Sequence, residues 1–269
     1  MRKEIYRIWA DDPRVTLTLF LDGEKRGAKS AVIVLPGGGY VANADGEADP
    51  IALHFAQMGY AAFVLRYSTL YDGFEVTDCE ENPHTKFPEP MLEVGAAISF
   101  VRDCSSELGI DPGKITLMGF SAGGHLAANY ANKWNTEAIG KPLGIPAKKL
   151  KPNGCVLCYA ATSLLSLGDS RMPEAVFGTD SVREEGLKSY SAQFGVNADT
   201  PPTFLWHAKD DDDVPVQQTI DMAKALADKG IAYEMHLFET GGHATALSVG
   251  LPAEAWKDMA DRFLLKNIK

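Results

Sequence analysis

The sequence predicts an α/β protein in which a mostly parallel, eight-stranded sheet lies between two layers of helices. Apolar, β-rich runs recur along the whole chain, and helical patterns separate the later ones. The first two runs alternate apolar with polar residues, as half-exposed antiparallel strands do. From residue 31 onward the runs are nearly continuous Val, Ile, Leu and Phe, which is typical of strands covered on both faces. The predicted strands are 4–9, 15–21, 31–36, 60–67, 114–120, 154–160, 202–208 and 233–239, and the predicted helices are 48–58, 89–108, 122–134, 216–229 and 252–267.

The composition is that of an ordinary globular protein. The 269 residues are 45% hydrophobic and 23% charged, so the core needs no disulfide or metal ion to be stable. The formal net charge of -10 argues against nucleic acid and anionic membranes as partners, because both would repel the chain. The N-terminal stretch MRKEIYRIWADDPRV lacks the apolar core of a secretory signal, and no run reaches transmembrane length. We therefore expect a cytoplasmic protein.

Two polar, turn-rich segments interrupt the alternation of strands and helices. They are 71–90 and 161–200, and both lie between predicted sheet elements. Long insertions of this kind tend to be functional lids rather than linkers. The chain shows no internal repeat and no interdomain linker. The prediction is a single domain over 1–269 with both insertions near the active site.

A C-x-x-C pair, Cys155 and Cys158, lies inside the apolar run at 154–160. On a strand, residues three apart point to opposite faces, so these two thiols would not hold one metal ion. No second cysteine pair completes a zinc site. Both cysteines are therefore predicted to be core residues of a reduced protein.

The strongest chemical signal is Gly119-Phe120-Ser121-Ala122-Gly123, at a point where a predicted strand runs straight into a predicted helix. This is the G-x-S-x-G motif in the strand–turn–helix context that it requires. The sharp turn strains the serine backbone and lifts its hydroxyl above the sheet edge, at a helix N-terminus that favours negative charge. Ser121 is the predicted nucleophile.

A glycine run follows the buried strand at 31–36, in the stretch LPGGGY. Bare backbone N–H groups there can approach a substrate oxygen. Gly38 and Gly39, together with the amide of Ala122, are the predicted oxyanion hole. A phosphate loop is the alternative, but no G-K-[ST] follows the glycines.

The base has to come from one of six histidines. His243 lies in ETGGHATAL, a glycine-flanked loop between the last strand and the last helix, from which it can reach over the sheet edge. His125 is one helical turn beyond Ser121 and is expected to support the turn rather than to take the proton. His243 is the predicted base.

The acid that orients the base is expected in the run DDDD, which follows the strand at 202–208. Asp212 and Asp213 lie near the start of the next helix, where a carboxylate favours the helix dipole without a catalytic role. Asp210 and Asp211 remain, and local geometry does not separate them.

The chain resembles the α/β-hydrolase superfamily, and within it the bacterial acetyl-esterase and acetylxylan-esterase-like branch. The stretches that carry the resemblance are LPGGGY, GFSAGGHLA, FPEPMLEVGAAISFVR, TPPTFLWHAKDDDDVPV and FETGGH, in family order and spread over nearly all of the chain. In that family the acid lies three residues before the Val of Val-Pro and four after the strand's final His. The resemblance thus implies Asp211, with Asp210 as its rival. The chain departs from the family in two places. It has PGGG where many relatives have HGGG, which leaves the oxyanion donors intact because they are backbone groups, and it has GHA where relatives often have GHG, in the loop beside the base.

The resemblance implies a serine carboxylesterase that needs no cofactor. The activity would be hydrolysis of short acyl esters, acetyl above all, of sugars or xylo-oligosaccharides. The expected partner is a small-molecule ester, and the sequence does not indicate an oligomeric state. Tyr40 and Phe87 could line the substrate pocket. The alternatives are an amide-acting hydrolase, such as a peptidase or arylformamidase, with the same three residues, and a non-catalytic small-molecule receptor.

Overall fold

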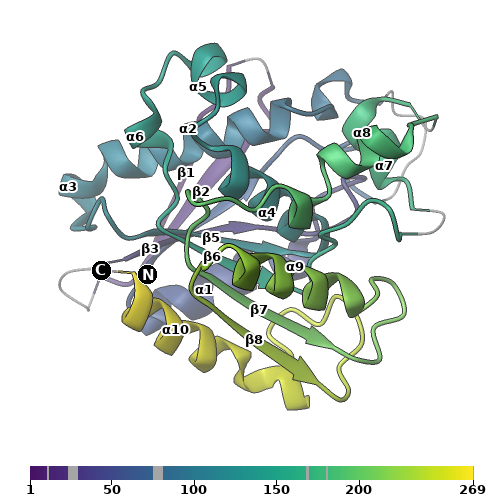
Figure 1. Ribbon diagram of the computed structural model, residues 1–269. Coiled ribbons are helices and arrows are strands. Elements are labelled where there is room, and N and C mark those ends of the chain that lie inside the picture. The colour runs from purple at the N-terminus through teal and green to yellow at the C-terminus, as the bar shows by residue number, and fades with distance from the viewer. Residues whose placement is uncertain (11, 24–29, 75–80, 168–169, 180, 269) are drawn as a thin grey trace.

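The computed structural model describes the whole chain except residues 11, 24–29, 75–80, 168–169, 180 and 269 (Figure 1). One eight-stranded sheet runs through it in the order β1-β2-β4-β3-β5-β6-β7-β8. The sheet is antiparallel from β1 to β4 and parallel from there to β8, as the sequence predicts. The strands are β1 Arg2–Arg7, β2 Thr16–Leu21, β3 Ala31–Leu35, β4 Ala61–Arg66, β5 Ile115–Phe120, β6 Gly154–Cys158, β7 Thr203–Ala208 and β8 Tyr233–Phe238.

Helices cover both faces of the sheet (Figure 1). One apolar cluster joins the sheet to α2, α4 and α9, and a second joins the opposite face to α1 and α10. Cys155 belongs to the first cluster and Cys158 to the second, which confirms that they point to opposite faces. The α-helices are α1 Asp49–Met58, α2 Glu89–Asp103, α3 Ser105–Leu108, α4 Ser121–Lys133, α5 Glu137–Leu143, α6 Ala147–Leu150, α7 Met172–Phe177, α8 Glu184–Ser189, α9 Gln217–Asp228 and α10 Trp256–Asn267, and the short 3₁₀ helices are η1 Asp45–Glu47, η2 Pro83–Thr85, η3 Ala192–Phe194 and η4 Pro252–Ala255.

The helices differ from the predicted pattern in a few places. The predicted helix 89–108 is interrupted at Cys104, whose ψ of 0° tilts the chain between α2 and α3. The predicted helix 252–267 begins as a 3₁₀ turn and continues as α10. The insertion 161–200 contains α7, α8 and η3, whereas residues 75–80 of the insertion 71–90 lie outside the described residues.

The sheet brings two loops side by side at the carboxyl ends of its central strands. β3 lies next to β5, and Leu35 pairs with Gly119 in parallel register. The glycine run that follows β3 therefore meets the turn that follows β5. Among the described residues, no helix has both the length and the apolar character needed to cross a membrane.

Candidate active site

Ser121 stands at the junction of β5 and α4 with a left-handed backbone, φ 49°. The flanking glycines permit this crossing. A Cβ on Gly119 would lie 2.3 Å from the carbonyl oxygen of Gly123, and a Cβ on Gly123 would lie 2.1 Å from that of Leu35. Any side chain at either position would push the helix away from the sheet. The structure thus has the strained strand-to-helix turn that the sequence predicts.

A continuous chain of hydrogen bonds links Ser121, His243 and Asp211. The Ser121 Oγ lies 2.9 Å from Nε2 of His243, and Nδ1 of the same ring lies 2.7 Å from Oδ2 of Asp211. Because an ionised carboxylate can only accept, Nδ1 carries the proton and Nε2 is free to accept from the serine. His243 comes from the loop after β8, residues 239–250, which we call the histidine loop. Its side chain is 12% exposed and that of Asp211 is 0% exposed.

The surroundings of Asp211 keep its carboxyl ionised. Oδ1 accepts the N–H groups of Asp213 and Val214 at 3.0 and 2.8 Å, while Oδ2 also receives Nε2 of His207 at 2.9 Å. Burial by itself raises the pKa of Asp211. The hydrogen bonds from His207, His243 and Val214 outweigh burial and hold that pKa well below its usual range.

The other members of the aspartate run lie elsewhere. Asp210 does not contact the imidazole: its Oδ1 accepts the N–H of Gly242 at 2.8 Å and so supports the histidine loop from outside. Asp212 and Asp213 are exposed and form part of the cavity wall in front of Ser121. Of the two candidates that local sequence left open, the structure places Asp211 against His243.

The glycine run after β3, with the turn that follows it (36–44), is called here the glycine loop. Gly38 and Gly39 have φ of 109° and 64°, and a Cβ on Gly38 would lie 2.0 Å from the carbonyl oxygen of Ala42. Both residues line the same cavity as Ser121. Ala122, the third predicted oxyanion donor, is fully buried in the first turn of α4.

A cavity of about 560 Å³ opens in front of Ser121 and His243. The two insertions contribute to its wall, with Phe74 from the first and Leu167, Ser170 and Met172 from the second. The remaining wall is the glycine loop, Glu47, the segment 212–214 and Ala244 of the histidine loop. The cavity has apolar and polar walls and is wide enough for a small substrate.

The pocket roles expected of Tyr40 and Phe87 do not match the structure, because neither is among the described residues that line this cavity. Tyr40 has φ 61° and turns into the core, where it is fully buried and its hydroxyl lies 2.9 Å from Nδ1 of His125. Phe87 packs against Tyr40, His125 and Tyr190. His125 donates from Nε2 to the carbonyl of Tyr190 at 2.7 Å, and burial lowers its pKa to about 4, so it serves this buried cluster as a neutral ring.

Three residues at the site were not singled out by sequence reasoning. His207 forms a hydrogen bond with the carboxylate of Asp211. Glu47 lies in the cavity wall and is 3% exposed. Tyr159 packs its ring against that of His243, with the two centroids 5.0 Å apart. His207 and Tyr159 lie in or just after apolar strands, and Glu47 lies in the stretch NADGEAD, which reads as a surface turn. Their roles depend on contacts between distant parts of the chain.

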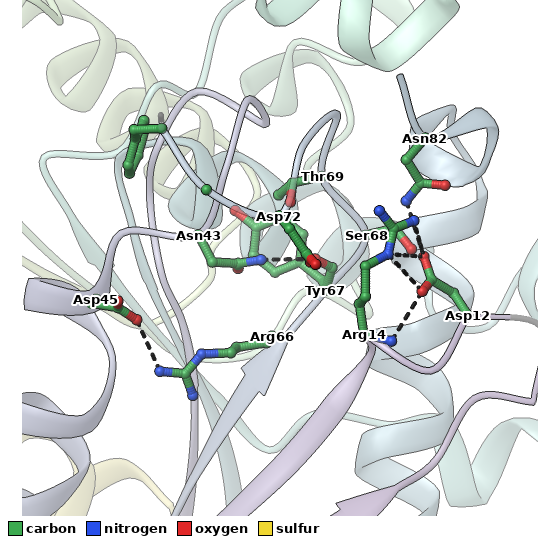
Figure 2. Close-up of a pocket in the computed structure, with 12 residues that line it drawn as sticks. Asp12, Arg14, Asn43, Asp45, Arg66, Tyr67, Ser68, Thr69, Asp72 and Asn82 are labelled. Carbon is green, nitrogen blue, oxygen red and sulfur yellow. Dashed lines mark hydrogen bonds and ion pairs between the residues drawn. The ribbon is translucent and has the colours of Figure 1, made fainter. Parts of the chain in front are cut away.

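A second, polar cavity of about 260 Å³ lies on the β4 side of the glycine loop (Figure 2). Phe74 lines both cavities, so the two share a wall. Figure 2 shows the polar groups that surround this second cavity. They are Asp12, Arg14, Asn43, Asp45, Arg66, Tyr67, Ser68, Thr69, Asp72 and Asn82.

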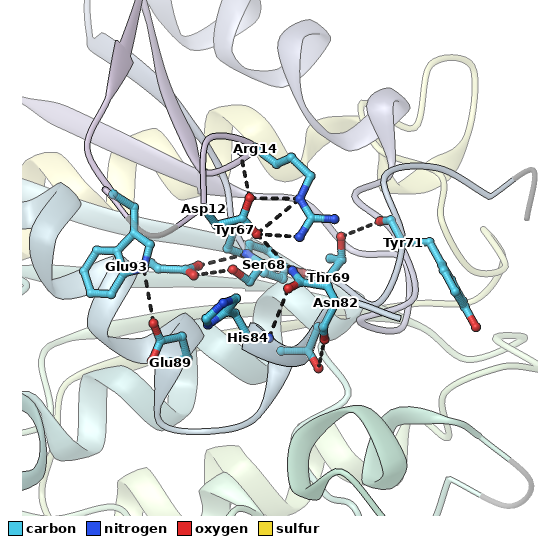
Figure 3. A network of polar contacts seen from close by, with 12 residues as sticks. Asp12, Arg14, Tyr67, Ser68, Thr69, Tyr71, Asn82, His84, Glu89 and Glu93 are labelled. Carbon is cyan, nitrogen blue, oxygen red and sulfur yellow. Dashed lines mark hydrogen bonds and ion pairs between the residues drawn. The ribbon is translucent and has the colours of Figure 1, made fainter. Parts of the chain in front are cut away.

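Behind that cavity runs a network of polar contacts (Figure 3). Asp12 accepts from Arg14 at 2.7 Å and from Asn82 at 3.0 Å. Ser68 donates its N–H to Glu93 at 2.8 Å and its hydroxyl to the other oxygen of the same carboxylate. Burial outweighs these two hydrogen bonds and raises the pKa of Glu93 to about 8.

The chain is similar in sequence to several known proteins. The BD-FAE family model matches residues 17–226. The chain is 29% identical over 236 residues to endo-1,4-beta-xylanase B of Butyrivibrio fibrisolvens, covering 88% of this chain and 35% of that protein. It is 26% identical over 243 residues to an acetylxylan esterase of Xylanibacter ruminicola, covering 87% and 44%. It therefore spans less than half the length of these two relatives.

Among solved structures, the acetyl ester-xyloside bifunctional hydrolase of Caldicellulosiruptor lactoaceticus superposes with a TM-score of 0.83. It is 30% identical, and the match covers 98% of this chain and 96% of that one. Fold, family model and relatives coincide: the chain belongs to the BD-FAE family, within the acetylxylan-esterase-like branch of the α/β-hydrolase esterases.

Proposed function

We propose that this protein is a serine esterase that hydrolyses short-chain esters, acetyl esters above all. The observation that carries the proposal is the unbroken hydrogen-bond chain from Ser121 through His243 to Asp211, with Ser121 and His243 lining a cavity beside the glycine loop. A serine, an imidazole and a buried carboxylate in this order are the groups that nucleophilic acyl transfer needs.

In the proposed first step, the Ser121 hydroxyl passes its proton to Nε2 of His243 while Oγ forms a bond to the ester carbonyl carbon. The carbonyl oxygen becomes negative and is held by the N–H groups of Gly38, Gly39 and Ala122. The imidazolium then gives its proton to the alcohol oxygen, the C–O bond breaks, and an acyl-enzyme remains. Asp211 stabilises the imidazolium throughout.

In the second step a water molecule replaces the alcohol. His243 takes one proton from the water, whose oxygen attacks the acyl carbon. The proton returns to Ser121 Oγ as the acid leaves, so the enzyme is restored.

The alcohol half of the substrate is proposed to be a sugar. The second cavity supports this because it shares Phe74 with the catalytic cavity and presents carboxylates, amides and guanidinium groups. Such groups can form hydrogen bonds with the neighbouring hydroxyls of a sugar, because every hydroxyl both donates and accepts hydrogen bonds. An acetylxylan esterase and an acetyl ester-xyloside hydrolase among the similar proteins point to the same substrate class.

Hydrolysis of p-nitrophenyl acetate, butyrate and octanoate tests the acyl-transfer proposal. We expect the acetate to have the highest kcat/KM and Ser121→Ala to lose at least about 10³-fold in kcat. Wild-type protein that is inert on all three esters, or a fully active Ser121→Ala, would refute it.

Acetylated xylosides test the sugar proposal separately. Asp72→Ala should reduce kcat/KM several-fold on the xyloside and leave p-nitrophenyl acetate unaffected, because only the former reaches the second cavity. Equal effects on both substrates would exclude the second cavity as the sugar site.

A further inference from the structure

The two loops that meet over Ser121 are joined behind the cavity by one buried carboxylate, that of Glu47. Glu47 is the last residue of η1, is 3% exposed, and lines the catalytic cavity. It contacts neither His243 nor Ser121 by a hydrogen bond among the described residues, so the steps above leave it without a role. Its two oxygens instead face two different loops.

One oxygen of Glu47 holds the glycine loop. The Gly37 N–H donates to Oε2 over 2.8 Å. No side chain fits at Gly37, because a Cβ built on it would lie 2.5 Å from that oxygen and 2.8 Å from the Cβ of Ser121. Gly37 directly precedes Gly38 and Gly39, the proposed oxyanion donors. The position of their N–H groups relative to Ser121 therefore depends on this hydrogen bond.

The other oxygen reaches the histidine loop through Tyr159, the residue after β6. The Tyr159 hydroxyl donates to Oε1 of Glu47 at 2.7 Å and accepts the N–H of Ala246 at 2.9 Å. Its ring packs edge to face on the imidazole of His243. One tyrosine thus supports the base through its ring and the base's loop through its hydroxyl.

The histidine loop requires such support. Ala244, Ala246 and Ser248 have φ of 54°, 49° and 52°, in the left-handed region that residues with a Cβ disfavour. Backbone of this kind persists only when its surroundings hold it. Ala246 is held on both sides, since its N–H meets Tyr159 and its carbonyl accepts Nε1 of Trp256 at 3.1 Å.

We propose that Glu47 and Tyr159 form a positioning pair that fixes the oxyanion donors and the histidine base relative to Ser121. The inference rests on the proposed esterase function and adds to it two residues that form no covalent bond and transfer no proton in the mechanism. Two donors, an N–H and an O–H, converge on this side chain from opposite sides. The two oxygens of a carboxylate accept both at once, one on each side.

Burial raises the pKa of Glu47 above its ordinary value, and the hydrogen bonds from Tyr159 and Gly37 and the charge of His243 offset part of that rise. The carboxylate form is the one that accepts both hydrogen bonds, so it is the form that keeps the two loops in place.

The test compares Glu47→Gln and Tyr159→Phe, singly and together, on p-nitrophenyl acetate. Gln keeps the shape of Glu but turns an NH₂ group toward one of the two donors. Phe keeps the ring on His243 and removes only the hydroxyl link. We expect kcat to fall about 50-fold for Glu47→Gln and about 10-fold for Tyr159→Phe, with KM within about threefold, because misplaced donors weaken the transition state more than the bound substrate. The double variant should resemble Glu47→Gln alone, since both changes break one path.

Glu93→Gln is the matched control. Glu93 is also a fully buried carboxyl group that meets one N–H and one O–H, both from Ser68, but it lines neither cavity. Its kcat should stay within about twofold of wild type if loss of a buried carboxylate does not by itself affect the reaction. Thermal midpoints of all variants show which are folded, and if Glu47→Gln does not fold, Tyr159→Phe decides the question.

The outcomes separate the two proposals. Wild-type kcat in Tyr159→Phe, additive losses in the double variant, or an equal loss in Glu93→Gln would each overturn the positioning pair. In those cases a loss of activity in Ser121→Ala would still support the proposed esterase function. If Ser121→Ala is active, the proposed function itself fails.

Discussion

Asp211 and Glu93 are both carboxylates without solvent contact, yet their pKa values move in opposite directions. Asp211 lies beyond the carboxyl end of β7, with two imidazoles and two backbone N–H groups around it. Glu93 lies on α2, where Ser68 supplies both of its donors. Burial penalises the charge of each, and the number and charge of the donors decide which effect prevails.

The two surroundings suit different roles: those of Asp211 stabilise a negative charge, and those of Glu93 favour a neutral acid that links two elements of the fold. Around Asp211 a negative charge is already stabilised before any imidazolium forms, so protonation of His243, the proposed base, costs little further free energy. Around Glu93 the neutral acid is favoured, and its bonds to Ser68 tie α2 to the end of β4. A buried carboxyl group thus serves two purposes in one molecule.

The largest expected effect comes from removing the charge of Asp211. Asp211→Asn should lower kcat on p-nitrophenyl acetate by about 10³- to 10⁴-fold, because His243 loses the partner that sets its tautomer. Asp210→Asn, which changes only the support of Gly242, should lose less than about tenfold, and its kcat is the direct control. If Asp210→Asn were inactive and Asp211→Asn active, the hydrogen bond between Asp211 and His243 would not be required for the reaction.

The next effect concerns stability and pH. The pKa of Glu93 is about 8 in the folded chain, against an ordinary value of 4.5. The stabilisation from the neutral acid is therefore complete below pH 4.5 and is lost as the pH rises through 8. By linkage this amounts to about 4 kcal/mol of unfolding free energy across that window.

Urea unfolding at pH 5, 6.5 and 8 measures this loss. Wild type should lose stability over the series, while Glu93→Gln, which cannot ionise, should show a flatter profile. Parallel profiles for the two proteins would mean that Glu93 is ionised in the fold, and the contrast with Asp211 would disappear.

The smallest expected effect concerns the hydrogen bond between Thr219 and His207, the imidazole that in turn donates to Asp211. Thr219 donates its hydroxyl to Nδ1 of His207 at 2.7 Å, which leaves Nε2 of that ring to donate to Asp211. Thr219→Val removes one buried hydrogen bond, so we expect a loss of about 1–2 kcal/mol in unfolding free energy. Steady-state kinetics should show kcat within about threefold, because Asp211 keeps its other donors. A loss as large as that of Asp211→Asn would make His207 an essential part of the site.

The sequence predicted the fold and the strand-to-helix turn at Ser121 well because both depend on local patterns. Eight runs of apolar residues mark the eight strands, and the glycines around Ser121 mark a turn that few other sequences can make. Asp211 was different: its neighbour Asp210 has the same chemistry, and only the family resemblance preferred one of them. The structure distinguishes the two by a backbone path that turns one carboxylate toward His243 and the other toward Gly242.

The remaining features depend on long-range packing. Glu47 and Tyr159 are 112 residues apart, and no spacing in the sequence joins them. For Tyr40 the expectation from the sequence was wrong. An aromatic residue after a glycine run can face either the cavity or the core, and Tyr40, with a φ of 61°, faces the core. The polar second cavity likewise collects residues from β4, the N-terminal segment and the first insertion.

The acidic wall formed by Asp212 and Asp213 affects how a reaction cycle ends. Hydrolysis of an ester near neutral pH releases a carboxylate anion into a cavity that already carries two exposed carboxylates. Like charges at such short range repel each other, so the anion should dissociate quickly and rebind poorly. We therefore expect weak product inhibition by acetate, and stronger inhibition in Asp212→Asn at low ionic strength. An enzyme with this wall would continue to turn over in a medium where acetate accumulates.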